Sequence, residues 1–309
     1  MKHKRVLVVL GGTSGEREVS LDSGRACIIA LKKLGYKIST FDPKKNSLSF
    51  INKKNIDIIF NALHGRDGED GVAQSYFEYL KIPYTHSGVI SSYNAMNKVI
   101  SKEIFKKNNI KSPEYFVLRK EKFNIIELKK FIIKKKINFP IVVKPTSEGS
   151  SLGVRICENI KDLNNSSKSL FKKYAELIFE PFIGGQEIQV AVINGTPLGA
   201  IELEPKRRFY DYKAKYSKAA NTKHIMPANL KKEKYKTVLQ IAKKAHSALG
   251  CKGITRSDFK FYDNKFYLLE INTQPGMTSL SLVPEIANYK GISFENLVQK
   301  ILFNAGLNR

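Results

Sequence analysis

The chain has 309 residues, 42% of them hydrophobic, which predicts a globular protein of two or three domains. Its formal net charge is +25, but the excess is mostly lysine on expected helix faces such as ALKKLG, KEIFKKNN, ELKKFIIKKK and IAKKAHSALG. We interpret these faces as solvated, so we expect no nucleic-acid function from charge alone. Three scattered cysteines and no apolar run of membrane-spanning length favour a cytoplasmic protein without disulfides or membrane contact.

The first third of the chain alternates strand and helix patterns. Strands are expected at 5–10, 37–41, 56–63 and 82–87, and helices at 19–35, 71–81 and, as one continuous helix, 91–108. This alternation predicts an open, mainly parallel sheet with helices on its faces. The loops GGTSGEREVS and LHGRDGEDG follow two of the strands, where the working loops of such sheets lie.

The rest of the chain predicts two further units. A small α+β unit has expected helices at 123–136 and near 163–174 and strands at 139–145, 153–157 and 176–182. An antiparallel pattern follows, with strands at 186–193 and 196–203 around the hairpin signal Asn194-Gly195, a helix at 232–249, a hairpin at 253–276 and a helix at 293–302. The long polar segment 204–227 favours a lid, a binding loop or disorder.

These patterns define the expected fold class, α/β and α+β, in three domains. The first, at 1–97, is an open, mainly parallel α/β domain. The second, at 98–188, is a small central α+β domain. The third, at 189–309, is an antiparallel-sheet domain that includes the loop 204–227.

The hairpin at 253–276 carries the most informative side chains. Glu270 and Asn272 lie two residues apart on one expected strand and therefore share a face. Arg256, Asp258 and Lys260 share a face of the partner strand. Two carboxylates and an amide oxygen are hard ligands that suit Mg²⁺. A solvated outer face is the alternative, but like charges placed opposite each other are destabilising without a cation between them.

This metal face requires a particular strand register. A two-residue turn at Asp263-Asn264 with regular pairing would put Asp258 opposite Leu269, whose side chain we expect on the apolar face with Ile271. A one-residue slip moves every side chain to the other face. We therefore predict a three-residue loop or a bulge that brings Asp258 opposite Glu270.

The stretch KPTSEGSSLGV, from Lys144 to Val154, follows an expected buried strand. Its lysine precedes the glycines, so it is not the G-x-x-x-x-G-K-[ST] phosphate loop. Lys144 at the strand end and the backbone N–H groups around Ser150 and Ser151 could still contact phosphates. Taken alone, the stretch is equally compatible with a surface turn.

Six stretches, in order along nearly the whole chain, resemble the D-alanine–D-alanine ligases of the ATP-grasp superfamily. They are LGGTSGEREVSLDSG, ALHGRDGEDG, VVKPTSEGSSLGV, YDYKAKY, GCKGITRSDF and LLEINTQPGMTSLSLVP. The resemblance implies an ATP-grasp fold and a cytoplasmic, commonly dimeric enzyme. Such an enzyme uses ATP and two Mg²⁺ or Mn²⁺ to join two D-alanines through an acylphosphate during peptidoglycan precursor synthesis.

The resemblance also assigns roles to residues of this sequence. It implies that metal ions bind Asp258, Glu270 and Asn272. It implies that ATP contacts Lys98, Lys144, Ser151, Glu180, Ile183, Glu187 and Lys215. D-alanine would contact Glu16, His64, Gly276, Ser281 and Leu282, and the catalytic group would be Glu16, Ser150, Tyr216, Arg256 and Ser281. Within that group, Arg256 would stabilise the tetrahedral intermediate.

Three positions depart from the family pattern. Pro181 and Gln274 stand where lysine and serine are common, and Lys213 replaces the usual glutamate of the tyrosine-rich motif. Two other functions stay open at this point. One is a different ATP-grasp carboxylate–amine ligase, and the other is a nucleic-acid binder using the basic, aromatic stretch RRFYDYKAKYSK.

Overall fold

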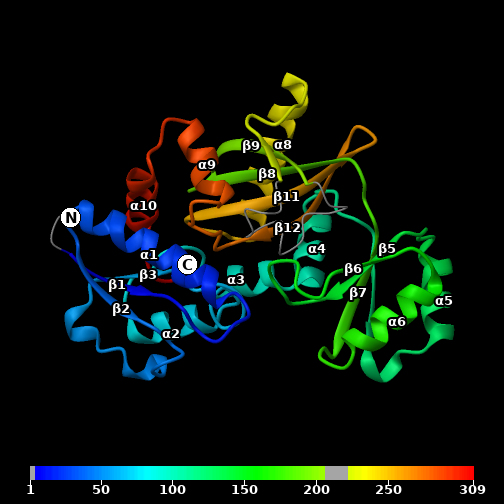
Figure 1. The fold of residues 1–309 in the computed structure, drawn as a ribbon, viewed down its shortest axis with the longest axis horizontal. Coiled ribbons are helices and arrows are strands. Elements are labelled where there is room, and N and C mark those ends of the chain that lie inside the picture. Colours follow the sequence, from blue (N-terminus) through cyan, green and yellow to red (C-terminus); the bar gives the residue numbers. More distant parts are fainter. Residues whose placement is uncertain (1–3, 206–221) are drawn as a thin grey trace.

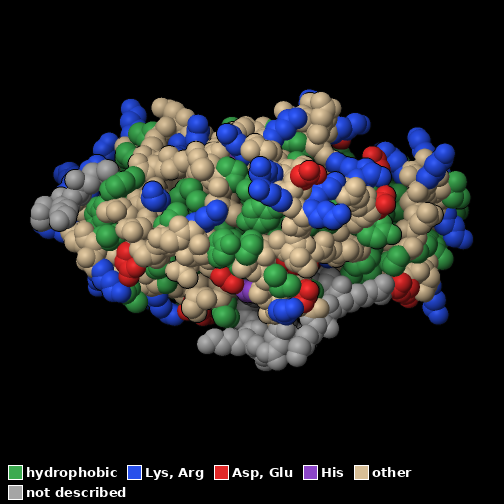
Figure 2. All heavy atoms as spheres, turned by 90° about the horizontal axis from the view of Figure 1, so that it is seen from above, with side chains coloured by type: hydrophobic (Ala, Val, Ile, Leu, Met, Phe, Trp, Pro, Cys, Tyr) green, Lys and Arg blue, Asp and Glu red, His purple; other side chains and the backbone are tan. Residues whose placement is uncertain are grey.

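The computed structural model describes residues 4–205 and 222–309, which form three sheets (Figure 1). In Figure 1 the N-terminal sheet lies on the left, the central sheet on the right and the C-terminal sheet between and above them. Among the described residues, no helix is both long and apolar enough to cross a membrane. Lysine and arginine side chains are dispersed over the face shown in Figure 2.

The N-terminal sheet is parallel, as predicted, with strand order β2-β1-β3. Its elements are β1 (Arg5–Val9), α1 (Arg17–Lys33), β2 (Lys37–Phe41), β3 (Ile58–Asn61) and α2 (Val72–Leu80). The prediction of a fourth strand at 82–87 is wrong, because only Tyr84 bridges, to Ile59 and Gly306. Tyr84 therefore lies between β3 and the C-terminal end of the chain, with main-chain hydrogen bonds in both directions to Gly306.

The predicted continuous helix at 91–108 is two helices, α3 (Val89–Met96) and α4 (Lys98–Lys107). Asn97 lies between them in an extended conformation, and its side chain accepts hydrogen bonds from the N–H groups of Val99 and Ile100. This capping begins a new helix because it satisfies N–H groups that have no partner within α4. The N–H of Lys98 donates to Thr146 O at 2.8 Å. This bond ties α4 to the stretch KPTSEGSSLGV at 144–154, which we call the glycine-serine loop.

The central sheet is antiparallel, with strand order β4-β7-β5-β6. Its elements are β4 (Phe116–Arg119), α5 (Ile125–Lys135), β5 (Ile141–Pro145), β6 (Arg155–Cys157), α6 (Ile160–Leu170) and β7 (Glu176–Pro181). A buried aromatic stack of Phe116 on Phe179, with ring centroids 4.8 Å apart, joins the two strands at one edge. Helices α5 and α6 lie together on one side of this sheet (Figure 1).

The C-terminal sheet is antiparallel, with strand order β10-β9-β8-β11-β12. Its elements are β8 (Gln186–Ile193), β9 (Thr196–Glu204), β10 (Lys223–Ile225), α8 (Lys232–Ala248), β11 (Ile254–Tyr262), β12 (Lys265–Asn272), α9 (Leu282–Tyr289) and α10 (Phe294–Phe303). Helix α9 was not predicted. Short 3-10 turns occupy Leu48–Phe50, Lys53–Asn55 and Lys120–Lys122.

The hairpin of β11 and β12 confirms the predicted register. Asp258 pairs with Glu270, and a bulge follows, so that Phe259 pairs with Leu268. The turn is the two-residue Asp263-Asn264, with both residues at positive φ. The bulge inserts an extra residue into one strand.

The bulge also overturns one detail of the prediction. Leu268, not Leu269, joins Ile271 in the hydrophobic core. Leu269 instead lines the cleft alongside Glu270. A bulge residue falls outside the regular alternation of side chains, which is why the period-two pattern misplaced it.

The hydrophobic cores do not follow chain order. One core combines β1 and β3 with residues from β8, β9, α9 and α10. The central sheet has a separate core of its own. The three domain boundaries given above therefore stay a prediction, since the first and last parts of the chain share buried side chains.

Gly185, between β7 and β8, should be the glycine least tolerant of substitution near the cleft. Its φ is +78°, and a Cβ there would overlap the carbonyl oxygen of Phe261. Gly195 has a similar φ of +75° but has nothing within 4 Å. Gly195→Ala should cost roughly 1 kcal/mol for the left-handed backbone, and Gly185→Ala roughly 1–3 kcal/mol more for the clash. Urea unfolding midpoints of both variants measure this, and equal shifts would contradict it.

Candidate active site

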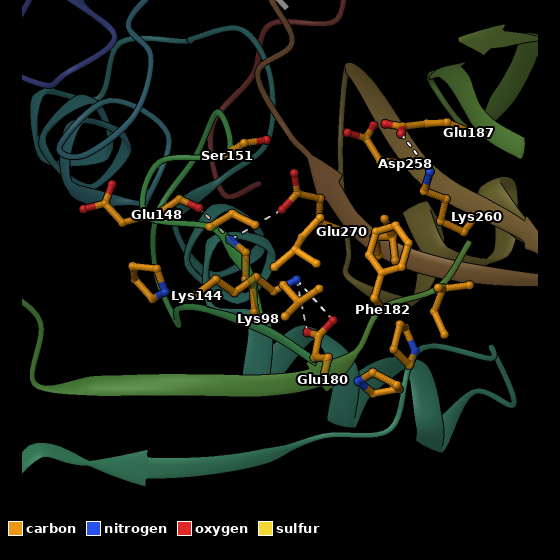
Figure 3. Close-up of a pocket in the computed structure, with 18 of the residues that line it drawn as sticks. Lys98, Lys144, Glu148, Ser151, Glu180, Phe182, Glu187, Asp258, Lys260 and Glu270 are labelled. Atoms are coloured by element: carbon orange, nitrogen blue, oxygen red, sulfur yellow. Dashed lines mark hydrogen bonds and ion pairs between the residues drawn. The ribbon is translucent and has the colours of Figure 1, made fainter. Parts of the chain in front are cut away.

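A cleft lies between the central sheet and the C-terminal sheet (Figure 3). Strands β5, β6 and β7 supply one wall, and β8, β11 and β12 supply the other. The polar residues that line it are Lys98, Lys144, Glu148, Ser151, Glu180, Glu187, Asp258, Lys260 and Glu270. Apolar side chains of the two sheets, among them Val142, Ile156, Phe182, Ile183 and Leu269, surround them. A slot with apolar walls and a few convergent charges is typical of a ligand site.

Four carboxylates of the cleft each have a cationic partner. The pairs are Asp258 with Arg256 (2.7 Å), Glu270 with Lys98 (3.4 Å), Glu180 with Lys144 (3.1 Å) and Glu187 with Lys260 (3.0 Å). Most of the side chains involved are nearly buried, so these charges would be unstable alone. The cleft thus holds cations that a polyphosphate could draw away from their carboxylates.

The predicted metal face is assembled by the bulged hairpin. Asp258 and Glu270 lie opposite each other, and Asn272 lies opposite Arg256 on the same strand pair. The Oδ1 atom of Asn272 accepts the Gln274 N–H at 2.8 Å, which orients the amide. No group of three His, Cys, Asp or Glu in the described ranges could hold a metal. Two opposed carboxylates with an amide oxygen as third donor nonetheless suit a hard divalent cation.

The glycine-serine loop closes one end of the cleft. Ser150 and Ser151 adopt positive φ values of 48° and 59°, which side-chain-bearing residues rarely do. Lys98 Nζ donates to Glu148 O at 2.5 Å and so attaches the loop to α4. Strained backbone held in place by other contacts is common at ligand sites.

A second chamber adjoins the cleft and shares Lys98, Glu148 and Glu270 with it. Ser150, Arg256, Asn272 and Glu69 also line this chamber. The hydroxyl of Ser150 donates a short hydrogen bond to Glu16 Oε2, so two of the predicted catalytic residues meet across the loops. The chamber thus joins the predicted substrate residues to the metal face.

Glu69 was not singled out from the sequence, although its loop LHGRDGEDG was. A Cβ placed on Gly149 would lie 2.5 Å from Glu16 Oε1 and 3.2 Å from Glu69 Oε1, so both carboxylates converge there. Glu69 Oε2 is buried without a hydrogen-bond partner among the described residues. Burial and then the charge of Glu16 raise the pKa of Glu69 well above its usual value. Glu69 therefore keeps its proton to a higher pH than an exposed glutamate does.

The remaining predicted substrate residues lie around the N-terminal sheet. His64 is buried, with Nε2 3.2 Å from Ser23 Oγ, and burial lowers its pKa to about 4, so its ring is neutral at pH 7. A Cβ on Gly276 would lie 2.8 Å from Ser281 Oγ, which places those two residues in close approach. The Leu282 side chain packs in the core, so only its main chain could meet a substrate.

Gln274, a departure from the family pattern, joins two parts of the site through hydrogen bonds. Its side chain accepts a hydrogen bond from Asn61 Nδ2 at 2.9 Å and donates a short one to Leu63 O. The residue is buried between the end of β3 and the end of β12. It therefore holds β12, the strand that carries Glu270 and Asn272, against the loop that carries His64.

The other end of the cleft contains Glu180, Ile183 and Glu187, as grouped in the sequence prediction. Pro181 has no N–H, and the N–H of Phe182 donates to Pro140 O at 2.8 Å. The next main-chain donor along this hinge is that of Ile183. Lys213, Lys215, Tyr216 and most of the predicted lid, 204–227, lie outside the described residues.

One lysine of the face KEIFKKNN is not solvated, contrary to the prediction. Lys102 is 1% exposed, whereas Lys106 and Lys107 on the same helix are exposed. Its ammonium lies 3.4 Å from Glu180 Oε1 and donates to Pro113 O at 3.1 Å. The lysine-rich composition of α4 gives no signal that distinguishes Lys102 from its neighbours.

Family models and a relative that spans nearly the whole chain indicate the same family. Family models described as "D-ala D-ala ligase N-terminus" and "D-ala D-ala ligase C-terminus" match residues 42–87 and 104–303. A D-alanine–D-alanine ligase from Pelagibacter ubique is 54% identical over 308 residues, covering 99% of each chain.

Two crystal structures are similar to this fold. D-alanine–D-alanine ligase from Bacillus anthracis complexed with ATP is 34% identical, with a TM-score of 0.84 over 98% of this chain and 97% of its own. The VanG D-Ala:D-Ser ligase from Enterococcus faecalis is 26% identical, with a TM-score of 0.84 over 98% and 99%.

The raised pKa of Glu69 predicts a pH-dependent effect of Glu69→Gln on stability. The raised pKa means that the folded protein keeps a proton that the unfolded chain loses above its ordinary value near 4.5. Wild-type stability therefore falls, relative to Glu69→Gln, as pH rises from about 4.5 towards the raised pKa. Thermal unfolding of the substrate-free proteins measures this at pH 5.5 and pH 8. The Tm of the variant minus that of the wild type should be more positive at pH 8 than at pH 5.5. If Glu69 is instead ionised and paired, the Tm of the variant relative to the wild type will fall as pH rises.

Proposed function

The chain belongs to the D-alanine–D-alanine ligase family, and on this premise we propose how its residues divide the work. Its ATP-grasp fold, predicted from the sequence, is confirmed. The enzyme joins two D-alanines to D-alanyl-D-alanine, a peptidoglycan precursor, at the expense of ATP. The observation that supports the assignment to this site is the cleft of paired charges between two sheets. It adjoins a chamber lined by Ser150, whose hydroxyl donates to Glu16.

The reaction has two chemical steps. The carboxylate of the first D-alanine takes the γ-phosphoryl group of ATP, which releases ADP and leaves an acylphosphate. The amine of the second D-alanine then attacks the acyl carbon, loses a proton and expels inorganic phosphate as the amide forms. Charge builds on phosphoryl oxygens in the first step and on the carbonyl oxygen in the second, so fixed cations near both positions accelerate the reaction.

We assign the nucleotide to the cleft. Lys98 and Lys144 would contact phosphates, with Ser151 contributing from the loop and Lys215 from outside the described residues. Glu180 and Ile183 would contact the base, and Glu187, held by Lys260, would accept from the ribose hydroxyls. The apolar walls would exclude water from the base and strengthen these polar contacts.

The opposed carboxylates fit two Mg²⁺ or Mn²⁺ ions. Asp258, Glu270 and Asn272 would hold them, and the ions would neutralise phosphate charge when bound. Asp258 and Glu270 now bind the side chains of Arg256 and Lys98. A shift of these carboxylates to metal would leave Arg256 and Lys98 able to turn towards the substrate.

The second chamber would hold the two amino acids. Glu16, ordered by Ser150 and, from outside the described residues, Tyr216, would bind the ammonium group of the first D-alanine. His64, neutral at pH 7, would pack nearby without adding charge. Arg256 and the Gly276 N–H would meet the developing oxyanion, and Ser281, with the Leu282 main chain, would meet the second carboxylate.

We also propose a cytoplasmic homodimer. The cysteines are free and buried, which suits a reducing compartment. Helices α2 and α3 expose Tyr79 (78%), Ile90 (66%) and Tyr93 (52%) near one another in the chain, and such residues favour a protein interface. Sedimentation equilibrium tests the dimer by giving the mass in solution.

A product assay tests the function. Purified protein with ATP and Mg²⁺ should release ADP and phosphate and form D-alanyl-D-alanine from D-alanine, with little turnover of L-alanine. D-serine supplied as a second substrate separates this activity from that named for the Enterococcus faecalis structure. Turnover with other amino acids and not with D-alanine would support the alternative, another ATP-grasp carboxylate–amine ligase.

Metal removal should abolish turnover, and the metal face should set the metal requirement. EDTA-treated wild type should regain activity on Mg²⁺ addition. Asp258→Asn should need at least about tenfold more Mg²⁺ for half-maximal rate, because losing a ligand charge weakens binding of a hard cation. Asp263→Asn, in the exposed hairpin turn, is the matched control. An unchanged Mg²⁺ requirement in Asp258→Asn would remove Asp258 from the metal site.

A further inference from the structure

Lys102 is a buried lysine to which the mechanism proposed above assigns no role. It lies one turn after Lys98 on α4, but unlike Lys98 it does not line the cleft. Its side chain is 0% exposed, and its ammonium donates to Pro113 O and lies 5.7 Å from the centre of the Tyr115 ring. Burying a lysine ammonium is costly, so a retained one calls for an explanation.

The partner of Lys102 does line the cleft. Glu180 has a side chain that is 3% exposed, with Lys144 Nζ 3.1 Å from Oε1 and 3.2 Å from Oε2. In Figure 3 the Lys144 side chain reaches towards the Glu180 carboxylate from the cleft side. The Lys102 ammonium, which does not line the cleft, lies 3.4 Å from Oε1. Both ammonium groups thus converge on Oε1, while Glu180 itself lines the cleft in which we place the nucleotide.

The two ammonium groups determine the charge of Glu180. Burial alone would raise the pKa of this carboxyl, but Lys102 and Lys144 together outweigh burial and hold the pKa below its usual value. Burial lowers the pKa of Lys102 to about 8, and Glu180 counteracts part of this effect. Tyr115 and Glu114 are the other titratable groups that influence this pair.

Lys144 alone would not keep Glu180 ionised once a nucleotide is bound. It lines the cleft, so in the proposed complex it is shared between Glu180 and nucleotide phosphate. As phosphate draws the ammonium away, the buried carboxylate would lose its compensation and take up a proton. Lys102 has no access to the ligand and remains with Glu180 throughout.

We propose that Lys102 is a positioning residue that keeps Glu180 an ionised, acceptor-only group facing the nucleotide base. The inference rests on the nucleotide site proposed above. An ionised carboxylate accepts from the amino group of adenine and repels the carbonyl oxygen of guanine. A protonated carboxyl can donate to that oxygen. Lys102 therefore sets the preference for ATP over GTP without touching either nucleotide.

The test measures nucleotide binding without turnover. Isothermal titration calorimetry with ATP and GTP, in Mg²⁺ and without D-alanine, gives a GTP/ATP ratio of dissociation constants for each protein. The variants are Lys102→Met, Glu180→Gln and the double variant. Lys106→Met is the matched control, because it removes one lysine charge from the exposed face of the same helix.

Lys102→Met should weaken ATP binding at least about tenfold at pH 7.5 and lower the GTP/ATP ratio by a similar factor. The ratio should fall further at pH 6.0, because Glu180 then binds a proton more readily. Wild type and Lys106→Met should keep their ratios over this pH interval, since Lys102 stays charged below pH 8. Equal weakening of ATP and GTP, or a ratio independent of pH in Lys102→Met, would overturn the inference.

The double variant keeps the proposal testable if Lys102→Met does not fold. It buries no unpaired carboxylate, so it should be better tolerated than the single change. If Lys102 acts through Glu180, the double variant will have the same nucleotide ratio as Glu180→Gln. An additional change in the ratio would overturn the inference. A wild type that binds neither nucleotide would instead overturn the proposed site.

Discussion

Pairing of buried charge is the constraint on which the cleft depends. Glu180, Glu187, Asp258 and Glu270 face a space with apolar walls, and each lies within 3.4 Å of a cationic group. A buried carboxylate without such a partner would cost several kcal/mol or become neutral. Some partners belong to the same hairpin, but Lys98 and Lys102 come from α4. The ion pairs therefore help set how the central and C-terminal sheets meet, as well as what they can bind.

The positions of these charges follow from strand pairing. In β11 and β12 the apolar side chains must face α8, and the two-residue turn would then misalign the polar faces by one position. The bulge after Asp258 absorbs this residue and brings Glu270 opposite Asp258. Leu269 consequently lines the cleft rather than the core. One irregularity in the sheet thus produces both the opposed carboxylates and part of the apolar wall.

Local patterns in the sequence predicted much of this arrangement but not its long-range contacts. Alternation along β8 and the Asn194-Gly195 turn predicted that hairpin, and the register argument predicted Asp258 opposite Glu270. The break at Asn97 was missed because both helices have the same periodicity. Glu69 and Lys102 were missed because their importance comes from burial against Glu16 and Glu180, which lie far away in sequence. Residue type alone does not reveal that a lysine among many lysines is buried.

Helix α4 shows why that distinction matters for the whole site. Lys98 and Lys102 are four residues apart, so they lie on the same face, about 6 Å apart along the axis at 1.5 Å per residue. The first is 3.4 Å from Glu270 on the predicted metal face, and the second is 3.4 Å from Glu180 at the other end of the cleft. The N–H of Lys98 also fixes the helix to the glycine-serine loop. One rigid helix therefore sets the spacing between the two ends of the cleft, and a shift of α4 would disturb both ends together.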